Sequence, residues 1–253
     1  MFYLERARPY LVEQTLLNEK ESKIERISTG IPGLDELIGG GFPKGSVILL
    51  SGTCGTGKTI SSLQFLWHGI QRGENGVYIS FEEPIKEVKK TARSFGWDFD
   101  KPEKEGKIDM IRYDPFHIED IIELISSSVK EVNAKRLVID SVSAIGMYIR
   151  DPAEVRRSIY LLVLNLYKLG CTTILTSEIP PEQIQLSRFG VEEFLADGVI
   201  VLYYTRVNSY FARAITVWKM RFTQHSQRIH PYKITENGVI VYPNEESALS
   251  RRI

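Results

Sequence analysis

Eight consecutive residues carry the clearest chemistry in the chain, and they read Gly52-Thr53-Cys54-Gly55-Thr56-Gly57-Lys58-Thr59. They fit the pattern G-x-x-x-x-G-K-[ST], in which a glycine-rich loop cradles phosphate groups. Glycines let backbone N–H groups approach phosphate oxygens, the lysine supplies a mobile positive charge, and the threonine hydroxyl can bind Mg²⁺. We therefore predict a nucleotide site with Mg²⁺, whose loop residues are Gly52, Thr53, Gly55, Thr56, Gly57, Lys58, Thr59 and Ile60.

Three carboxylates follow stretches that are expected to be strands. Asp140 ends the apolar run 137–141, where a phosphate-loop protein needs an acid to hold the water shell of Mg²⁺. The alternative is an aspartate that only caps the next turn. We expect Thr59 and Asp140 to be the metal-binding residues.

Glu82 and Glu83 follow the apolar run 76–81 directly. Because strand residues alternate, two adjacent acids at a strand end cannot both point the same way. One is expected to polarise an attacking water and the other to orient it or to bond a neighbour. Adjacent carboxylates in a partly desolvated site raise one another's pKa, which suits a general base. A solvated charged turn is the alternative; beside a phosphate loop we favour Glu82, Glu83 and Lys58 as catalytic residues.

Composition places the chain among ordinary soluble globular proteins. It has 253 residues, 43% of them hydrophobic and 25% charged, with 32 basic and 32 acidic side chains. This balance gives no overall attraction to nucleic acid, and the longest apolar runs are too short to cross a bilayer. The N-terminus lacks the apolar stretch of a secretory signal, and Cys54 and Cys171 are expected to be free thiols. These features predict a cytoplasmic protein.

The elements needed to position these residues alternate along the chain. Strands are expected at 46–51, 76–81, 108–113, 137–141 and 172–176, with helices at 60–70, 84–95, 118–132 and 152–169 between them. Such alternation predicts an α/β fold with a mostly parallel sheet covered by helices on both faces. A short helix is expected over 32–38. Beyond residue 196, strand-like runs at 199–204, 212–220, 232–234 and 239–242 predict an antiparallel extension at one edge, with turns at Asn208-Ser209 and Asn237-Gly238.

Three segments are expected in the domain organisation. Residues 26–242 form one domain. Residues 1–25 form an N-terminal extension, either helical or loosely attached. Residues 243–253 form a short flexible tail.

Five stretches together resemble the KaiC family of RecA-like P-loop ATPases. Beside the phosphate loop, these are Ile27 to Asp35, Ser80-Phe81-Glu82-Glu83, Ala92 to Trp97 and Phe189 to Asp197, in the same order as in that family. The resemblance runs from about residue 24 to 242, within a single domain of this type. It implies a RecA-like P-loop NTPase fold and an ATPase that uses Mg²⁺.

The resemblance also implies a ring of six subunits with ATP held between neighbours. One subunit would give the phosphate loop, the paired glutamates and Ser94, and its neighbour would give Lys219 and Arg221 to neutralise the γ-phosphate. Lys219 and Arg221 are two apart on an expected strand and so share a face, although an edge strand protected by charge gives the same pattern. The other nucleotide contacts implied for the neighbour are Met220, Thr223, His225, Thr235 and Glu236.

The functions left open are a regulatory or signalling ATPase, a scaffold that only binds ATP, and a single-stranded DNA-binding protein of recombination or repair. The paired glutamates argue against the scaffold. The loops that would face DNA, 143–150 and 180–189, hold Arg150 and Arg188 but little other positive charge. The region Glu192-Glu193-Phe194 has no hydroxyl where the family's phosphorylated domain has a Ser-Thr pair, so self-phosphorylation there is not expected. A protein partner is also expected, but the sequence does not identify it.

Overall fold

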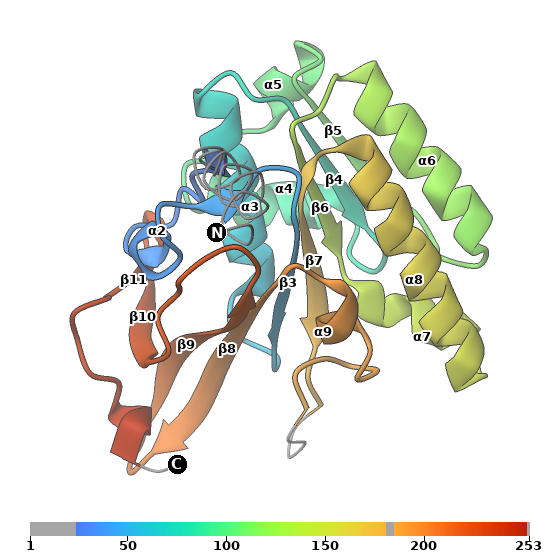
Figure 1. Ribbon diagram of the computed structural model, residues 1–253. Coiled ribbons are helices and arrows are strands. Elements are labelled where there is room, and N and C mark those ends of the chain that lie inside the picture. The colour runs from blue at the N-terminus through green and yellow to red at the C-terminus, as the bar shows by residue number, and fades with distance from the viewer. Residues whose placement is uncertain (1–23, 181–184, 252–253) are drawn as a thin grey trace, which may run out of the picture.

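The computed structural model describes residues 24–180 and 185–251. Its main sheet has nine strands in the order β11 (Gly238–Val241), β10 (Ile229–Thr235), β9 (Tyr210–Met220), β8 (Gly198–Val207), β3 (Val47–Gly52), β7 (Thr172–Glu178), β6 (Arg136–Asp140), β4 (Gly76–Ser80) and β5 (Ile108–Arg112) (Figure 1). The strands from β8 to β5 are parallel, while β9, β10 and β11 pair antiparallel at one edge. The predicted α/β fold, with its antiparallel extension, is confirmed.

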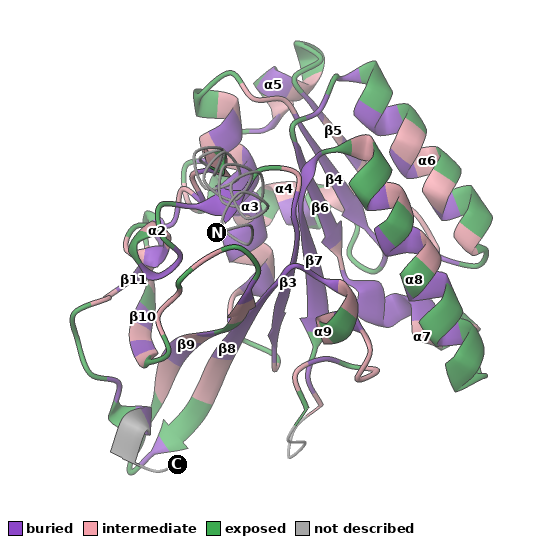
Figure 2. Cartoon of the chain, viewed as in Figure 1, coloured by how far each residue is buried: buried purple, intermediate pink, exposed green. Residues whose placement is uncertain are grey.

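Helices cover both faces of the parallel strands. The helices α3 (Lys58–Gln71) and α4 (Ile85–Arg93) pack on one face, and α6 (Ile118–Glu131) and α8 (Pro152–Leu169) pack on the other (Figure 1). Alternate residues of β3 divide between these two cores, with Ile48 and Leu50 on the α3 side and Val47 and Leu49 on the α8 side. The central strands are therefore buried throughout, and α6 and α8 expose only their outer surfaces (Figure 2).

The caps of α8 show how local sequence fixes an element. The Asp151 carboxylate accepts a hydrogen bond of 2.9 Å from the Ala153 N–H, Pro152 occupies the first turn, and Gly170 ends the helix with a φ of 69°. The predicted start and end of this helix are confirmed. The other predicted helices and strands also occur, with ends that differ by a few residues.

Several short elements were not predicted because they span too few residues to show a period. They are β1 (Arg26–Ile27), β2 (Phe42–Pro43), α5 (Asp100–Lys104), η1 (Val142–Ala144), α7 (Ile145–Tyr148) and α9 (Glu192–Leu195). The helix expected over 32–38 is the shorter α2 (Leu34–Leu37).

The structure describes little of the expected N-terminal extension and most of the expected C-terminal tail. The expected extension 1–25 lies outside the described residues except for its last two. In the segment expected to be a flexible tail, η2 (Ala248–Arg251) contains Leu249, which is 6% exposed and lies against Val207 and Ala214. Leu249 is therefore a contact of this segment with the β8–β9 ribbon.

Candidate functional site

The loop that joins β3 to α3 has the backbone that the glycine pattern requires. Gly55 and Gly57 have φ values of 77° and 90°, in the left-handed region that favours glycine. At Gly52 a Cβ atom would lie 2.6 Å from the Leu202 carbonyl oxygen of the adjacent strand. The sequence therefore fixes both the turn of this loop and its close packing on β8, and α3 begins at Lys58 with its N–H groups at the loop.

Lys58 is held inside this loop by main-chain carbonyl groups. Its Nζ donates hydrogen bonds of 2.9 Å to the Gly52 oxygen and 3.1 Å to the Thr53 oxygen. Burial lowers the pKa of the Lys58 ammonium, and the nearby charges of Glu178 and Asp140 act in the opposite direction. Within the described residues Lys58 is held by neutral acceptors and forms no ion pair, so it can turn to an anion without first breaking one, and the loop fits a phosphate group.

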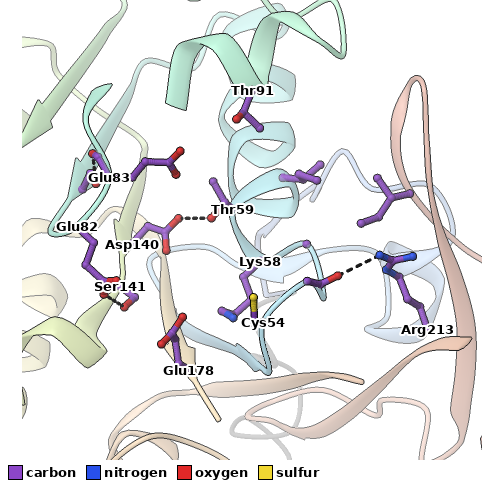
Figure 3. A pocket seen from close by; sticks show the side chains of 15 residues that line it. Cys54, Lys58, Thr59, Glu82, Glu83, Thr91, Asp140, Ser141, Glu178 and Arg213 are labelled. Atoms are coloured by element: carbon purple, nitrogen blue, oxygen red, sulfur yellow. Dashed lines mark hydrogen bonds between the residues drawn. The ribbon is translucent and has the colours of Figure 1, made fainter. Parts of the chain in front are cut away.

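Asp140 collects three hydroxyl donors from three different elements. Its Oδ2 accepts from Thr59 Oγ1 at 2.7 Å and from the Tyr78 hydroxyl at 2.9 Å, and its Oδ1 accepts from Thr176 Oγ1 at 2.5 Å. The first contact joins the two residues predicted to bind the metal (Figure 3). Tyr78 and Thr176 were not predicted, because they reach Asp140 from the strands on either side of β6 and the strand order is not written in the sequence.

Glu82 and Glu83 both line the same cavity. They leave the strict alternation of a strand because β4 ends at Ser80. Glu82 Oε1 accepts a 2.8 Å hydrogen bond from Ser141 Oγ (Figure 3). Desolvation raises the pKa of Glu83, and the charges of Asp140 and Glu87 add to this effect. Glu82 is not among the causes, so the expected mutual effect of the adjacent pair is replaced by that of Asp140 and Glu87.

These side chains surround a cavity of about 480 Å³ at the carboxyl ends of the parallel strands. This is the end at which α/β sheets bind ligands, and the volume suits a small molecule. The residues that line it include the loop, Ile60, both glutamates and Asp140, which the sequence predicted, and four that it did not: Thr91, Glu178, Arg213 and Ile234.

Two of these additional residues bring charge to the cavity. Glu178 ends β7, so the rule that carboxyl ends of parallel strands meet at one edge would have found it. Arg213 comes from the middle of β9, where no sequence signal marks it. Its guanidinium stacks 4.1 Å from the centre of the Tyr204 ring and donates a 3.1 Å hydrogen bond to the Gly55 carbonyl oxygen (Figure 3).

Lys219 and Arg221 lie away from the phosphate loop of their own chain. Lys219 pairs with Val199 at the beginning of β8, and the Asp197 N–H just before it bonds the Val47 oxygen at the beginning of β3. The two cations are therefore at the amino ends of these strands, whereas the loop follows the carboxyl end of β3. Any contact of these cations with a triphosphate would have to be made in another subunit.

Both cations lie along the same segment of chain. Lys219 Nζ donates to the Ala196 oxygen at 2.6 Å and to the Glu193 oxygen at 3.1 Å, at the end of α9. Arg221 forms an ion pair of 3.2 Å with the buried Asp197. The strand pattern is interrupted by a bulge at Val199–Ile200, and β9 ends at Met220. The side chains of Lys219 and Arg221 nevertheless reach the same surface.

The remaining residues predicted from the resemblance fall in three places. Met220 is buried in the core, and Thr223 and His225 follow it, where Thr223 Oγ1 accepts from Arg26 at 2.9 Å and His225 Nδ1 lies 3.0 Å from the Ser226 oxygen. Ser94 is exposed at the end of α4, and its hydroxyl donates to the oxygen of Thr91 at 2.7 Å.

Thr235 and Glu236 stand apart from the other residues assigned to a neighbour. They form the tip of the β10–β11 hairpin, in which Thr235 pairs with Gly238. Ile234, directly before them, lines the cavity of this chain and lies close to Gly57. The structure thus groups this hairpin with the phosphate loop of its own chain rather than with Lys219 and Arg221.

Three further features of the described residues concern metal-binding clusters, membrane-spanning helices and cysteines. In the described ranges, 24–180 and 185–251, no three His, Cys, Asp or Glu side chains are grouped closely enough to hold a metal by themselves. Among those same residues no helix is both long and apolar enough to cross a membrane. Cys54 and Cys171 are free thiols, as predicted.

Comparison with known proteins independently supports the resemblance to the KaiC family. The family described as "ATPase: KaiC" matches residues 27–246. A UPF0273 protein of Thermotoga maritima is 41% identical over 239 residues, which cover 88% of this chain and 98% of that protein. The circadian clock oscillator protein KaiC of Synechococcus elongatus is 35% identical over 246 residues, which cover 93% of this chain and 47% of that protein.

A solved structure agrees with these sequence matches. The crystal structure of a KaiC-like protein of Pyrococcus horikoshii has a TM-score of 0.81 and 44% sequence identity, and the match covers 87% of this chain and all of that one. None of these names refers to DNA, so the DNA-binding alternative gains no support. Because family, relatives and fold agree over nearly all of the described residues, the chain belongs to the KaiC ATPase family.

Proposed function

We propose that this protein binds ATP with Mg²⁺ and hydrolyses it to ADP and phosphate. The observation that carries the proposal is that one cavity holds the phosphate loop, the Thr59–Asp140 contact and both glutamates. Binding alone would need only the loop. A carboxylate beside the place where the terminal phosphate would lie can activate a water, and this cavity offers two.

Thr59 and Asp140 are the residues that would hold Mg²⁺. One hydroxyl and one carboxylate suffice, because Mg²⁺ keeps several waters and takes its other ligands from phosphate oxygens. When bound, the ion would neutralise phosphate charge. The loop N–H groups and Lys58 would hold the phosphates in place, which is the positioning that phosphoryl transfer depends on.

Glu82 and Glu83 have different surroundings, and these suit them to different roles in the activation of the water. Ser141 fixes one oxygen of Glu82, so this residue is suited to orient the attacking water. Burial and the charges of Asp140 and Glu87 raise the pKa of Glu83, which suits a proton acceptor. We therefore assign the general base to Glu83 and the orientation of the water to Glu82.

We further propose that a neighbouring subunit completes the site, within a ring of six. Lys219 and Arg221 would stabilise the negative charge that develops on the transferred phosphoryl group, as an arginine finger does. Their position at the far end of β8 from the loop supports a role in trans. A ring whose geometry follows its nucleotide would serve as a regulatory or signalling switch in the cytoplasm, a reducing compartment that suits the free thiols.

Self-phosphorylation of the Glu192–Phe194 region is not part of this proposal. Glu192 is 1% exposed and accepts hydrogen bonds from Ser177 Oγ at 3.0 Å and Ser187 Oγ at 2.7 Å. A buried carboxylate with these partners is a structural residue.

Phosphate release from Glu82→Gln and Glu83→Gln variants tests the proposal. Each substitution keeps the size of the side chain and removes its charge, so we expect a fall in turnover of about 10²–10⁴-fold with little change in nucleotide binding. Glu123→Gln, on the exposed face of α6, is the matched control and should retain wild-type turnover. A wild-type protein that binds ATP without releasing phosphate would leave only the scaffold function.

A further inference from the structure

Glu178 is a fourth carboxylate in the cavity, and the proposed reaction assigns it no task. It is the last residue of β7 and pairs in register with Gly52, the last residue of β3. Its side chain is exposed to the cavity and is directed into the space between Ser141 and Lys58 (Figure 3). The carboxylate therefore stands beside the phosphate loop.

The backbone of Glu178 is held firmly on both sides. Its N–H donates a 2.8 Å hydrogen bond to Ser143 Oγ, and the following Ile179 N–H donates a 3.1 Å bond to the Gly52 oxygen. That same Gly52 oxygen accepts the ammonium of Lys58. The backbone of Glu178 is thus fixed to the loop that would hold the phosphates, and its side chain starts from a fixed point beside that loop.

The electrostatic surroundings of Glu178 are unusual for a phosphate site. Among the charges that act on Lys58, that of Glu178 has the largest effect, ahead of Asp140 and Glu82. Asp140 receives three hydrogen bonds and Glu82 one, but within the described residues no hydrogen bond is found to the Glu178 carboxylate. Its charge is not shared with any donor and faces the cavity.

We propose that Glu178 repels the terminal phosphate of a bound triphosphate and so sets the preference of this site between ATP and ADP. The inference rests on the proposed function. In a phosphate loop the lysine reaches the β- and γ-phosphates, so a charge beside Lys58 lies close to the group by which the two nucleotides differ. Two negative charges a few ångströms apart in a partly desolvated cavity repel one another strongly.

The sign of this effect separates the proposal from two other roles. A carboxylate that bound Mg²⁺, or accepted a proton from water, would favour the triphosphate, and its removal would weaken ATP binding. A carboxylate that only stabilised the loop would affect both nucleotides alike. Only repulsion predicts that removing the charge tightens the binding of the triphosphate alone.

The test is calorimetric titration of the full chain with Mg²⁺ and either ADP or the non-hydrolysable β,γ-imido analogue of ATP. In Glu178→Gln we expect the ratio of triphosphate to diphosphate affinity to rise about tenfold over wild type, the scale of one unscreened charge pair. Glu178→Asp should leave the ratio near that of wild type, and Glu123→Gln should not change it. The rise should shrink at high salt, because mobile ions screen the repulsion.

An unchanged ratio, or a lower one, in Glu178→Gln would overturn the inference while leaving the proposed function intact. Parallel loss of both affinities would assign Glu178 to the structure of the loop and would also overturn it. A wild-type protein that binds neither nucleotide would overturn both proposals. Because Glu178→Gln removes no hydrogen bond seen in the described residues, we expect the variant to fold.

Discussion

Glu82 and Glu83 are neighbours in sequence but not in environment. The Ser141 hydroxyl donates a hydrogen bond to the Glu82 carboxylate. Glu83 is desolvated and lies in the field of Asp140 and Glu87, which favours its protonated form. One strand end thus presents two chemically different acids, and this difference is what lets them divide a reaction.

The raised pKa of Glu83 predicts the acid side of the pH profile of ATP hydrolysis. The base must be deprotonated to act, so activity should rise with pH through the pKa of Glu83, at a higher pH than an ordinary glutamate would give. Glu87→Gln removes one cause of the upward shift and should move this limb of kcat toward lower pH. Steady-state kinetics across the acid range measures it, with Glu123→Gln as control. An acid limb that stays in place in Glu87→Gln would remove Glu83 from the role of base.

At the residue scale the sequence predicted the acids but not their partners. Gly55 and Lys58 were found because a phosphate loop prescribes residue types at fixed spacings, and Asp140 because it ends an apolar strand, where such a protein needs an acid. Tyr78 and Thr176 could not be found, since their contacts with Asp140 depend on which strands flank β6. Local chemistry is written in the chain, whereas the pairing of distant strands is not.

At the element scale, α9 and the loop before it are held by one buried acid. Besides Ser177 and Ser187, Glu192 Oε2 accepts the Phe189 N–H at 3.3 Å. The carbonyl groups at the end of α9 then accept the ammonium of Lys219. A four-residue helix has little stability of its own, so these polar contacts must fix it.

Glu192→Ala should therefore destabilise the fold. The substitution leaves the buried Ser177 hydroxyl and the Phe189 and Val191 N–H groups without their acceptor, whereas Ser187 Oγ keeps its contact with Glu193. Each buried group that loses its acceptor costs about 1–3 kcal/mol. We expect the free energy of unfolding to fall by roughly 2–4 kcal/mol in denaturant titrations. Glu123→Ala, on the exposed face of α6, should change it by less than about 0.5 kcal/mol. Equal stabilities of the two variants would mean that α9 does not depend on Glu192.

At this scale the long helices were predicted from the sequence, and the shortest ones were not. The helix α6 was predicted from its apolar stripe, and α8 was predicted from Asp151 and Gly170 at its ends. The helix α9 was missed because four residues cannot show a period, and its stabilising contacts come from β7.

At the scale of the whole molecule, the sheet separates two sets of charges. The acids lie at the carboxyl ends of the parallel strands, and Lys219 and Arg221 lie at the amino ends of β3 and β8. The sequence indicated both sets, but only the register of β8 and β9 shows that one subunit cannot bring them together. A head-to-tail assembly would place the cations of one copy on the acids of the next, and such contacts form a ring when the rotation between copies closes and a filament when it does not.

Mixing two inactive variants tests this arrangement. One carries Glu82→Gln and Glu83→Gln, the other carries Lys219→Ala and Arg221→Ala, and each alone should lose at least about 100-fold in phosphate release. Random co-assembly in equal amounts makes an intact seam where an unaltered acid pair meets unaltered cations, so about a quarter of wild-type activity should return. As a control, Lys233→Ala is used in place of the variant that carries Lys219→Ala and Arg221→Ala, because it removes a positive charge outside the proposed seam.

The size of the assembly decides how that result is interpreted. With ATP and Mg²⁺ the wild-type protein should elute as an oligomer in size-exclusion chromatography coupled to light scattering, and the mixed sample should match it. Complementation arises only if both subunits share one active seam, because two variants that act independently can give no more than the mean of their separate rates. An invariant monomer, or a mixture that stays at that mean, would place Lys219 and Arg221 outside the reaction and leave hydrolysis to the residues of a single chain.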